Sequence, residues 1–172
     1  MIVVCINGAP GAGKDEFVKQ CQKINPLVIN ISTVDFIKKI ARECGWDGTK
    51  TPENRKFLSD LKFLLADWND VPYKKVIEGL KVIKANSENA IVFIHVREPA
   101  EIFRFATEVG ALTLIVRRKS AEDKVASNIA DRDVLNYDYD YIVDNNGSIE
   151  ALADQASMFL ETIEGSERLI LF

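Results

Sequence analysis

The chain has 172 residues, 47% of them hydrophobic and 28% charged, and its 22 basic and 26 acidic residues give a net charge of −4. This length buries one sizeable core without disulfides but is short for two ordinary domains, and the apolar content is too high for a disordered chain. No apolar run approaches the roughly 20 residues of a membrane-spanning helix. The acidic balance also argues against a nucleic-acid polymer as partner, because such binding relies on basic residues.

The cysteines point to a reducing compartment. Cys5, Cys21 and Cys44 are odd in number and lack the C-x-x-C spacing of zinc and redox sites. The apolar start of the chain has no basic leader and no small-residue cleavage site, so we expect no signal peptide. The composition therefore predicts a cytoplasmic protein with no membrane partner. We expect it to be a monomer or a homodimer.

Five short apolar runs rich in β-branched residues predict strands, at 2–6, 27–31, 90–96, 112–116 and 139–143. Most of these runs are continuously apolar, which is typical of strands buried on both faces of a parallel sheet. Helical patterns separate the runs. The alternation predicts an α/β fold with a five-stranded parallel sheet and right-handed crossovers.

The connection between the second and third strands, 32–89, is too long for one crossover helix. It contains about three helical patterns and no convincing strand, which indicates an insertion at the carboxyl edge of the sheet. Thr51, Pro52 and Glu53 mark a helix start: an N-cap hydroxyl, a first-turn proline and an acid. An apolar face with Trp68 follows, and we expect this face to belong to the core.

A phosphate-binding pattern directly follows the first strand. Residues 8–15 read G-A-P-G-A-G-K-D, which is G-x-x-x-x-G-K with aspartate in place of the usual serine or threonine. Glycines let backbone N–H groups turn towards a phosphate, the following helix adds partial positive charge, and Lys14 reaches the β- and γ-phosphates. The nucleotide contacts expected here are Gly8, Gly11, Ala12, Gly13, Lys14 and Asp15.

Two positions, one in this loop and one at the end of the third strand, depart from the pattern usual for proteins with such a loop. Asp15 replaces a hydroxyl that normally binds Mg²⁺, and its carboxylate can bind the metal directly, bind it through water, or cap the helix. Mg²⁺ is expected in each case, because nucleoside triphosphates bring their own oxygen ligands. The second departure is His95, which stands where the third strand should end in an acid. The chain has no N-K-x-D guanine signature.

These segments together resemble the nucleoside monophosphate kinase group of P-loop kinases. Within this group the chain is most similar to phage-type deoxynucleoside monophosphate kinases and animal phosphomevalonate kinases, and the triplet 13–15, G-K-D, is the most telling mark. Arg97 matches the arginine of a D-x-R strand end, and residues 114–117 look like the strand and arginine that lead into the lid. Residues 30–38 look like the second strand and acceptor-binding start, and 139–148 is similar to the D-x-x-I-x-N-x-G-S segment before the last helix.

The resemblance implies a P-loop kinase, a three-layer α/β/α sandwich with a five-stranded parallel sheet. It implies a single domain over 1–172, with an acceptor-binding helical insertion at 32–89 and a short lid at 118–133. The implied reaction moves the γ-phosphoryl of ATP, bound with Mg²⁺, to a small phosphorylated acceptor, foremost a (deoxy)nucleoside monophosphate. A phosphomevalonate-kinase-like enzyme, a non-enzymatic ATP-binding sensor and a nucleic-acid end kinase are the alternatives.

The resemblance and the residue pattern also assign roles to single side chains. The expected catalytic residues are Lys14, Arg97 and Arg117, the metal ligand is Asp15, and Asn145 joins the nucleotide contacts. The expected acceptor contacts are Thr33, Asp35, Lys38, Arg55, Asp60, His95 and Arg97. Arg118 and Arg132 are expected to reach in from the lid. Structural roles stay open for five of these residues: a helix-start acid for Asp35, an ion pair for Arg97, a hydrogen-bonded core imidazole for His95, and surface charges for Arg55 and Asp60.

Overall fold

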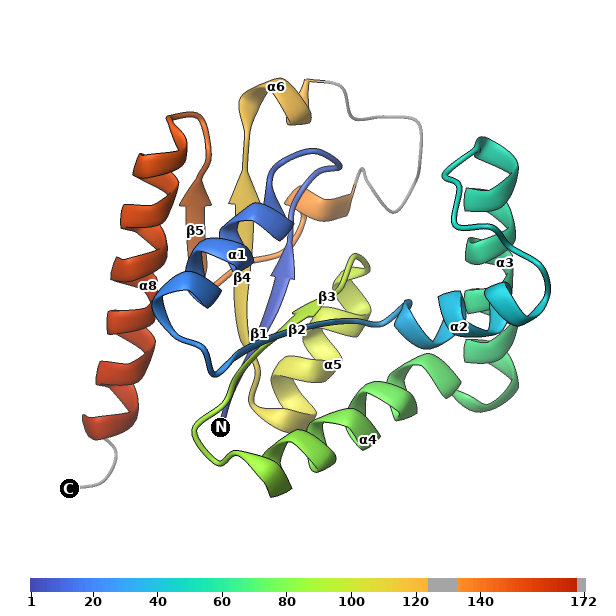
Figure 1. Ribbon diagram of the computed structural model, residues 1–172, viewed down its shortest axis with the longest axis horizontal. Coiled ribbons are helices and arrows are strands. Elements are labelled where there is room, and N and C mark those ends of the chain that lie inside the picture. The colour runs from blue at the N-terminus through green and yellow to red at the C-terminus, as the bar shows by residue number, and fades with distance from the viewer. Residues whose placement is uncertain (124–132, 170–172) are drawn as a thin grey trace. The chain divides into compact units, whose positions relative to one another are not determined.

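The structure, a computed structural model, describes residues 1–123 and 133–169 (Figure 1). The chain divides into two compact units: the first comprises Met1–Asn30 and Asn89–Phe172, and the second is Ile31–Glu88. The second unit therefore begins and ends within one residue of the insertion expected at 32–89.

A five-stranded parallel sheet forms the middle layer of the first unit, with the strand order β2-β3-β1-β4-β5. All five predicted strands are confirmed, each within two residues at either end. The strands are β1 (Ile2–Asn7), β2 (Val28–Ser32), β3 (Ile91–His95), β4 (Leu112–Arg117) and β5 (Tyr141–Asp144). All six residues of β1 are buried, as the unbroken apolar run of this central strand predicts.

The register of the sheet decides which residues meet at its carboxyl edge. β1 pairs with β3 on one side and with β4 on the other, so that Ile6 lies opposite His95 and Asn7 lies opposite Ile115. β4 pairs with β5 so that Arg117 lies opposite Asp144. Because parallel strands end at the same edge, the segments that follow β1, β3, β4 and β5 meet there, where open α/β sheets bind ligands.

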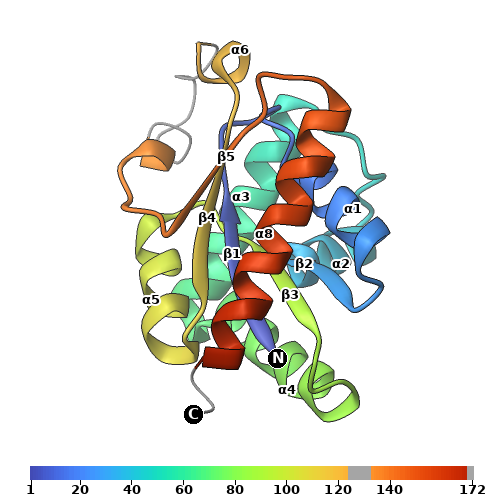
Figure 2. The same cartoon turned by 90° about the vertical axis from the view of Figure 1, so that its left-hand side faces the viewer.

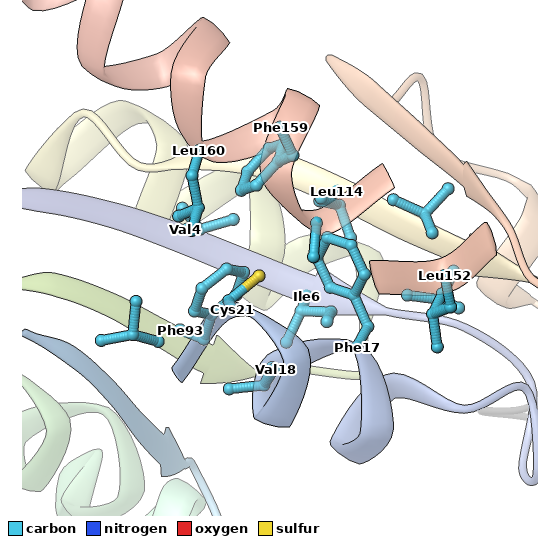
Figure 3. Close-up of a cluster of buried hydrophobic side chains, with 14 of the residues drawn as sticks. Val4, Ile6, Phe17, Val18, Cys21, Phe93, Leu114, Leu152, Phe159 and Leu160 are labelled. Atoms are coloured by element: carbon cyan, nitrogen blue, oxygen red, sulfur yellow. The ribbon is translucent and has the colours of Figure 1, made fainter. Parts of the chain in front are cut away.

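Helices cover both faces of this sheet, so the predicted three-layer arrangement is confirmed (Figure 2). α1 (Lys14–Ile24) and α8 (Ile149–Leu169) pack together on one face, and α5 (Pro99–Val109) contacts β1 and β4. Between the strands and the α1–α8 layer, the rings of Phe17, Phe93 and Phe159 form a cluster with centroids 5.8 to 6.2 Å apart (Figure 3). Edge-to-face contacts of this kind add to the free energy gained by burying the rings.

Short elements complete the first unit. Helix α6 (Lys119–Glu122) follows β4, and a 3₁₀ helix, Asp133–Leu135, precedes β5. Within the part of the chain that the structure describes, no helix has the length and apolar character needed to cross a membrane.

The second unit is built from three helices, α2 (Asp35–Glu43), α3 (Pro52–Asn69) and α4 (Val71–Asn86). The predicted start of α3 is confirmed: the Thr51 hydroxyl accepts a hydrogen bond from the Asn54 N–H at 3.2 Å, and Pro52 occupies the first turn. Asp70, in the left-handed conformation with φ 53°, joins α3 to α4.

The placement of Trp68 in the core is wrong, because this side chain is 73% exposed. Helix α3 contacts α4 and α2. Leu58, Leu61 and Leu65 on this helix are only half-buried, and its buried residue is Lys62. Helical periodicity predicts which residues share a face, but it does not show how wide a stripe the neighbouring helices cover.

The three thiols should differ sharply in reactivity. Burial raises the pKa of Cys5 and of Cys21 to about 12, whereas Cys44 is exposed. Because the thiolate is the reactive form, we expect a chromogenic disulfide reagent at pH 8 to modify one thiol in the folded protein and three in denaturant. The variant Cys44→Ser is the control, and its folded form should show no rapid reaction. A second fast thiol in the folded wild type would contradict the burial of Cys5 and Cys21.

Candidate phosphate-binding site

The loop between β1 and α1 contains three glycines with positive φ, and at two of them there is also no room for a side chain. Gly8 has φ 148°, and Gly13, the N-cap of α1, has φ 98°. A Cβ on Gly8 would collide with the carbonyl oxygen of Val116 in β4, and a Cβ on Gly13 would collide with the side-chain amide of Asn145. The neighbouring strands thus hold the loop so tightly that its glycine pattern is a packing requirement as well as a conformational one.

Lys14 places a positive charge over this loop. Its Nζ donates hydrogen bonds to the carbonyl oxygens of Gly8 at 2.6 Å and Ala9 at 3.1 Å. Lys14 is also the first residue of α1, so the first-turn N–H groups of this helix point to the same region. A loop that turns around a lysine at a helix N-terminus offers charge and N–H donors to an anion such as phosphate.

The segment after β5 closes the loop from the other side. The Asn145 side chain donates a hydrogen bond to the carbonyl oxygen of Ala12 at 2.8 Å, and its backbone N–H donates to the carbonyl oxygen of Arg117 at 2.8 Å. Asn146 Oδ1 accepts from the Lys119 N–H at 2.9 Å. Asn145 therefore holds the end of the phosphate loop against the end of β4.

A buried asparagine that the sequence reasoning missed fixes the start of the loop. Asn7 Oδ1 accepts from the Gly8 N–H at 2.8 Å, and Asn7 Nδ2 donates to the Arg97 carbonyl oxygen at 3.1 Å and to the Tyr139 hydroxyl at 2.8 Å. The Tyr139 hydroxyl donates to the Val134 carbonyl oxygen at 2.9 Å, and burial raises its pKa to about 12, which keeps this donor proton in place. The sequence feature that could have identified Asn7 is its position as a polar residue at the end of an otherwise apolar strand, directly before Gly8.

The structure brings the two departures from the usual pattern together. His95 Nε2 lies 3.6 Å from Asp15 Oδ1. The His95 side chain is 17% exposed at the end of β3, whereas the Asp15 side chain is 84% exposed in the first turn of α1.

The two expected catalytic arginines both follow buried strand segments. Arg97 is exposed just beyond β3, and its carbonyl oxygen is held by Asn7. Arg117 ends β4 and binds Glu122 in a bidentate pair, with Nε and Nη2 each 2.9 Å from a carboxylate oxygen. This pair lowers the pKa of Glu122 and raises that of Arg117. A phosphate group can accept the same two parallel hydrogen bonds from a guanidinium.

The lid expected at 118–133 is described only in part. Arg118 is the N-cap residue of α6, with its side chain exposed. Arg132 lies outside the described residues, so its expected lid role stays a prediction.

The remaining acceptor-binding candidates belong to the second unit, where each charged one has a local partner. Asp35 Oδ2 accepts from the Ser32 N–H at 2.7 Å, and Asp35 Oδ1 lies 3.4 Å from Lys38 Nζ at the start of α2. On α3, Arg55 donates to a backbone carbonyl at 3.2 Å and Asp60 pairs with a lysine at 2.6 Å. Thr33 is buried, with 4% of its surface exposed.

The donor set fits a magnesium ion that arrives with a nucleotide. Among the described residues there is no group of three or more His, Cys, Asp or Glu side chains that could hold a metal ion by itself. The exposed carboxylate of Asp15 beside the phosphate loop is one suitable oxygen ligand. Magnesium in nucleotide sites takes one or two carboxylates and completes its shell with phosphate oxygens and water.

Comparison with known proteins identifies the fold. Neither a search of protein-family models nor a search of curated protein sequences finds a match. Among solved structures, the chain is similar to dephospho-CoA kinase from Campylobacter jejuni, with TM-score 0.52 and 14% identity over 94% of this chain and 96% of that one. It is also similar to shikimate kinase from Aquifex aeolicus, with TM-score 0.50 and 12% identity over 96% of this chain and 98% of that one.

The fold is therefore the α/β fold of P-loop kinases, as the sequence resemblance implied. At these identities the likeness defines the fold alone. The finer likeness to phage-type deoxynucleoside monophosphate kinases and phosphomevalonate kinases is not supported by these comparisons and stays a prediction.

Two glycine substitutions test the packing of the loop. Gly11→Ala and Gly13→Ala both place a Cβ on a residue with positive φ, which costs about 1–2 kcal/mol. Only Gly13→Ala also meets the Asn145 amide, since the space beside Gly11 is open. We expect urea unfolding to show a further loss of about 1–3 kcal/mol for Gly13→Ala. The further loss should shrink in an Asn145→Ala background. Equal losses for the two variants would contradict the close contact.

Proposed function

We propose that this protein is an ATP-dependent phosphotransferase that moves the γ-phosphoryl group to a small phosphorylated acceptor, foremost a (deoxy)nucleoside monophosphate. The observation that carries the proposal is the loop of residues 8–14. It is packed too tightly for side chains at Gly8 and Gly13, and two of its carbonyl oxygens accept hydrogen bonds from Lys14 Nζ. The loop lies at the carboxyl end of the central strand and at the N-terminus of α1.

Phosphate binding requires only small rearrangements of these groups. The two carbonyl oxygens that hold the Lys14 ammonium are acceptors that phosphate oxygens can replace. The loop backbone stays in position because Asn7 and Asn145 bond its two ends. Phosphoryl transfer depends mainly on positioning and charge neutralisation, and a loop held from outside is organised before the ligand arrives.

Arg97 and Arg117 are proposed to neutralise charge on the transferring group and on the acceptor. Arg117 would exchange the Glu122 carboxylate for a phosphate with the same bidentate geometry. Asp15 would hold magnesium, which when bound spreads the charge of the β- and γ-phosphates.

The second unit is proposed to bind the acceptor. Its candidate contacts on α2 and α3 are charged side chains whose ion pairs are exposed, and exposed pairs exchange partners at little cost. Residues 118–133 are proposed as a lid that excludes water when both substrates are bound. In this proposal the protein is a single P-loop kinase domain that works in the cytoplasm as a monomer or a homodimer.

The test of the proposal is a coupled ADP-release screen with ATP and Mg²⁺ across nucleoside monophosphates, deoxynucleoside monophosphates, phosphomevalonate and oligonucleotides. We expect at least one acceptor to stimulate ADP release. Lys14→Met should lower kcat by about 100-fold or more, because it removes a positioned positive charge. Lys19→Met is the matched control on the same helix; Lys19 is exposed and pairs only loosely with Glu16, at 3.8 Å.

The outcomes of this screen separate the alternatives. Stimulation by phosphomevalonate alone would identify the other acceptor class. ATP binding without turnover for any acceptor would favour the sensor, and phosphorylation of oligonucleotide ends would favour the end kinase. Turnover no higher than that of Lys14→Met with every acceptor would refute the kinase proposal.

The role of Arg117 has its own matched pair of variants. Arg117→Gln and Glu122→Gln break the same ion pair, so both should lose a similar amount of stability. Only Arg117→Gln removes the charge proposed to meet phosphate, so its kcat should fall by about 100-fold while Glu122→Gln keeps most of its activity. Steady-state kinetics and thermal unfolding of both variants provide the measurement. Similar kcat losses in the two would mean that the pair only supports α6.

A further inference from the structure

The two unusual residues of the candidate site form a pair. Asp15 is the second residue of α1, and His95 is the last residue of β3. The strand register places His95 opposite Ile6, two residues before the phosphate loop begins at Gly8. This register brings the imidazole to the first turn of α1, where His95 Nε2 lies 3.6 Å from Asp15 Oδ1.

In the usual phosphate site the carboxylate lies on the strand instead of the helix. There a hydroxyl in the first turn of the helix and a carboxylate at the end of a neighbouring strand hold magnesium together. Here the helix supplies the carboxylate, Asp15, and the strand supplies an imidazole, His95.

We propose that His95 is a positioning residue that orients the carboxylate of Asp15, and that Asp15 is a carboxylate ligand of nucleotide-bound magnesium. The inference rests on the proposed function, because the metal arrives with the nucleotide. It gives the two departures from the usual pattern one joint role.

The exposure of the two side chains supports this division of roles. Asp15 is 84% exposed, so its carboxylate can take several rotamers when nothing holds it. His95 is 17% exposed on a buried strand, which fixes its ring. A small rotation of the Asp15 side chain shortens the 3.6 Å separation to hydrogen-bond length, with the imidazole N–H donating to the carboxylate. Partners of this kind orient metal ligands and raise their affinity for the metal.

The pair predicts how the two residues should depend on each other. Asp15→Ser removes the proposed metal ligand. His95→Phe keeps a ring but removes the hydrogen bond that would position Asp15. Each single variant should therefore weaken metal binding. The double variant Asp15→Ser, His95→Phe should lose no more than Asp15→Ser alone, because no carboxylate is left for residue 95 to position.

The experiment is calorimetric titration of the full-length protein with ATP in Mg²⁺ and in EDTA, for the wild type, both single variants and the double variant. The measured quantity is the ratio of the ATP Kd values in EDTA and in Mg²⁺. We expect magnesium to tighten ATP binding in the wild type, and each single variant to lose about 10-fold of this effect. The losses of the two single variants should not add in the double variant.

Two further variants separate positioning from a structural role of the histidine. His95→Ala should lower the metal effect while its Kd for ATP in EDTA stays within about two-fold of the wild type. His95→Gln keeps an N–H donor and should regain part of the effect. These variants also test the inference if the double variant does not fold.

Failure of the inference differs from failure of the proposed function. ATP binding with an unchanged metal effect in His95→Ala and His95→Phe overturns the inference and leaves the function standing. A double variant no better than the sum of the single losses also overturns it. If the wild type binds no ATP in either buffer, the proposed function fails, and the inference fails with it.

Discussion

The side-chain amide of Asn7 organises the carboxyl edge on which the candidate site depends. A buried amide is stable only when its donors and acceptor are bonded, and Asn7 meets this condition through three different segments. It accepts from the first N–H of the phosphate loop and donates to the segment after β3 and to Tyr139 before β5. Loss of any one segment would leave a buried polar group without a partner, so the segments hold one another in place.

The other end of the loop is held by a second amide, that of Asn145. The two amides bond the loop from its outer side, and the strand carbonyl behind Gly8 leaves it no room to move back. Such support favours anion binding, because the N–H groups of the loop are already in position and need not reorganise when the anion binds. The phosphate site is therefore a property of the whole carboxyl edge, and the G-x-x-x-x-G-K pattern is its local part.

This distinction explains what the sequence could predict. Strands buried on both faces leave apolar runs, and Thr51 with Pro52 caps a helix locally, so both were readable from neighbouring residues. The bond between Asn7 and Tyr139 joins positions 132 residues apart and needs the strand order and register. Trp68 was misplaced because periodicity does not report how much of a helix its neighbours cover. Asp15 and His95 were each recognised as unusual, but only the β1–β3 register makes them neighbours.

The charges of the site explain how an acidic chain can present a phosphate site. Lys14 and Arg117 both have oxygen partners within the protein: backbone carbonyls for Lys14 and the carboxylate of Glu122 for Arg117. Glu122 neutralises Arg117 until a phosphate takes its place, so this charge becomes available only when a competing anion binds. In the proposed enzyme, Arg117 would therefore act at the step that brings the phosphoryl group and the acceptor together.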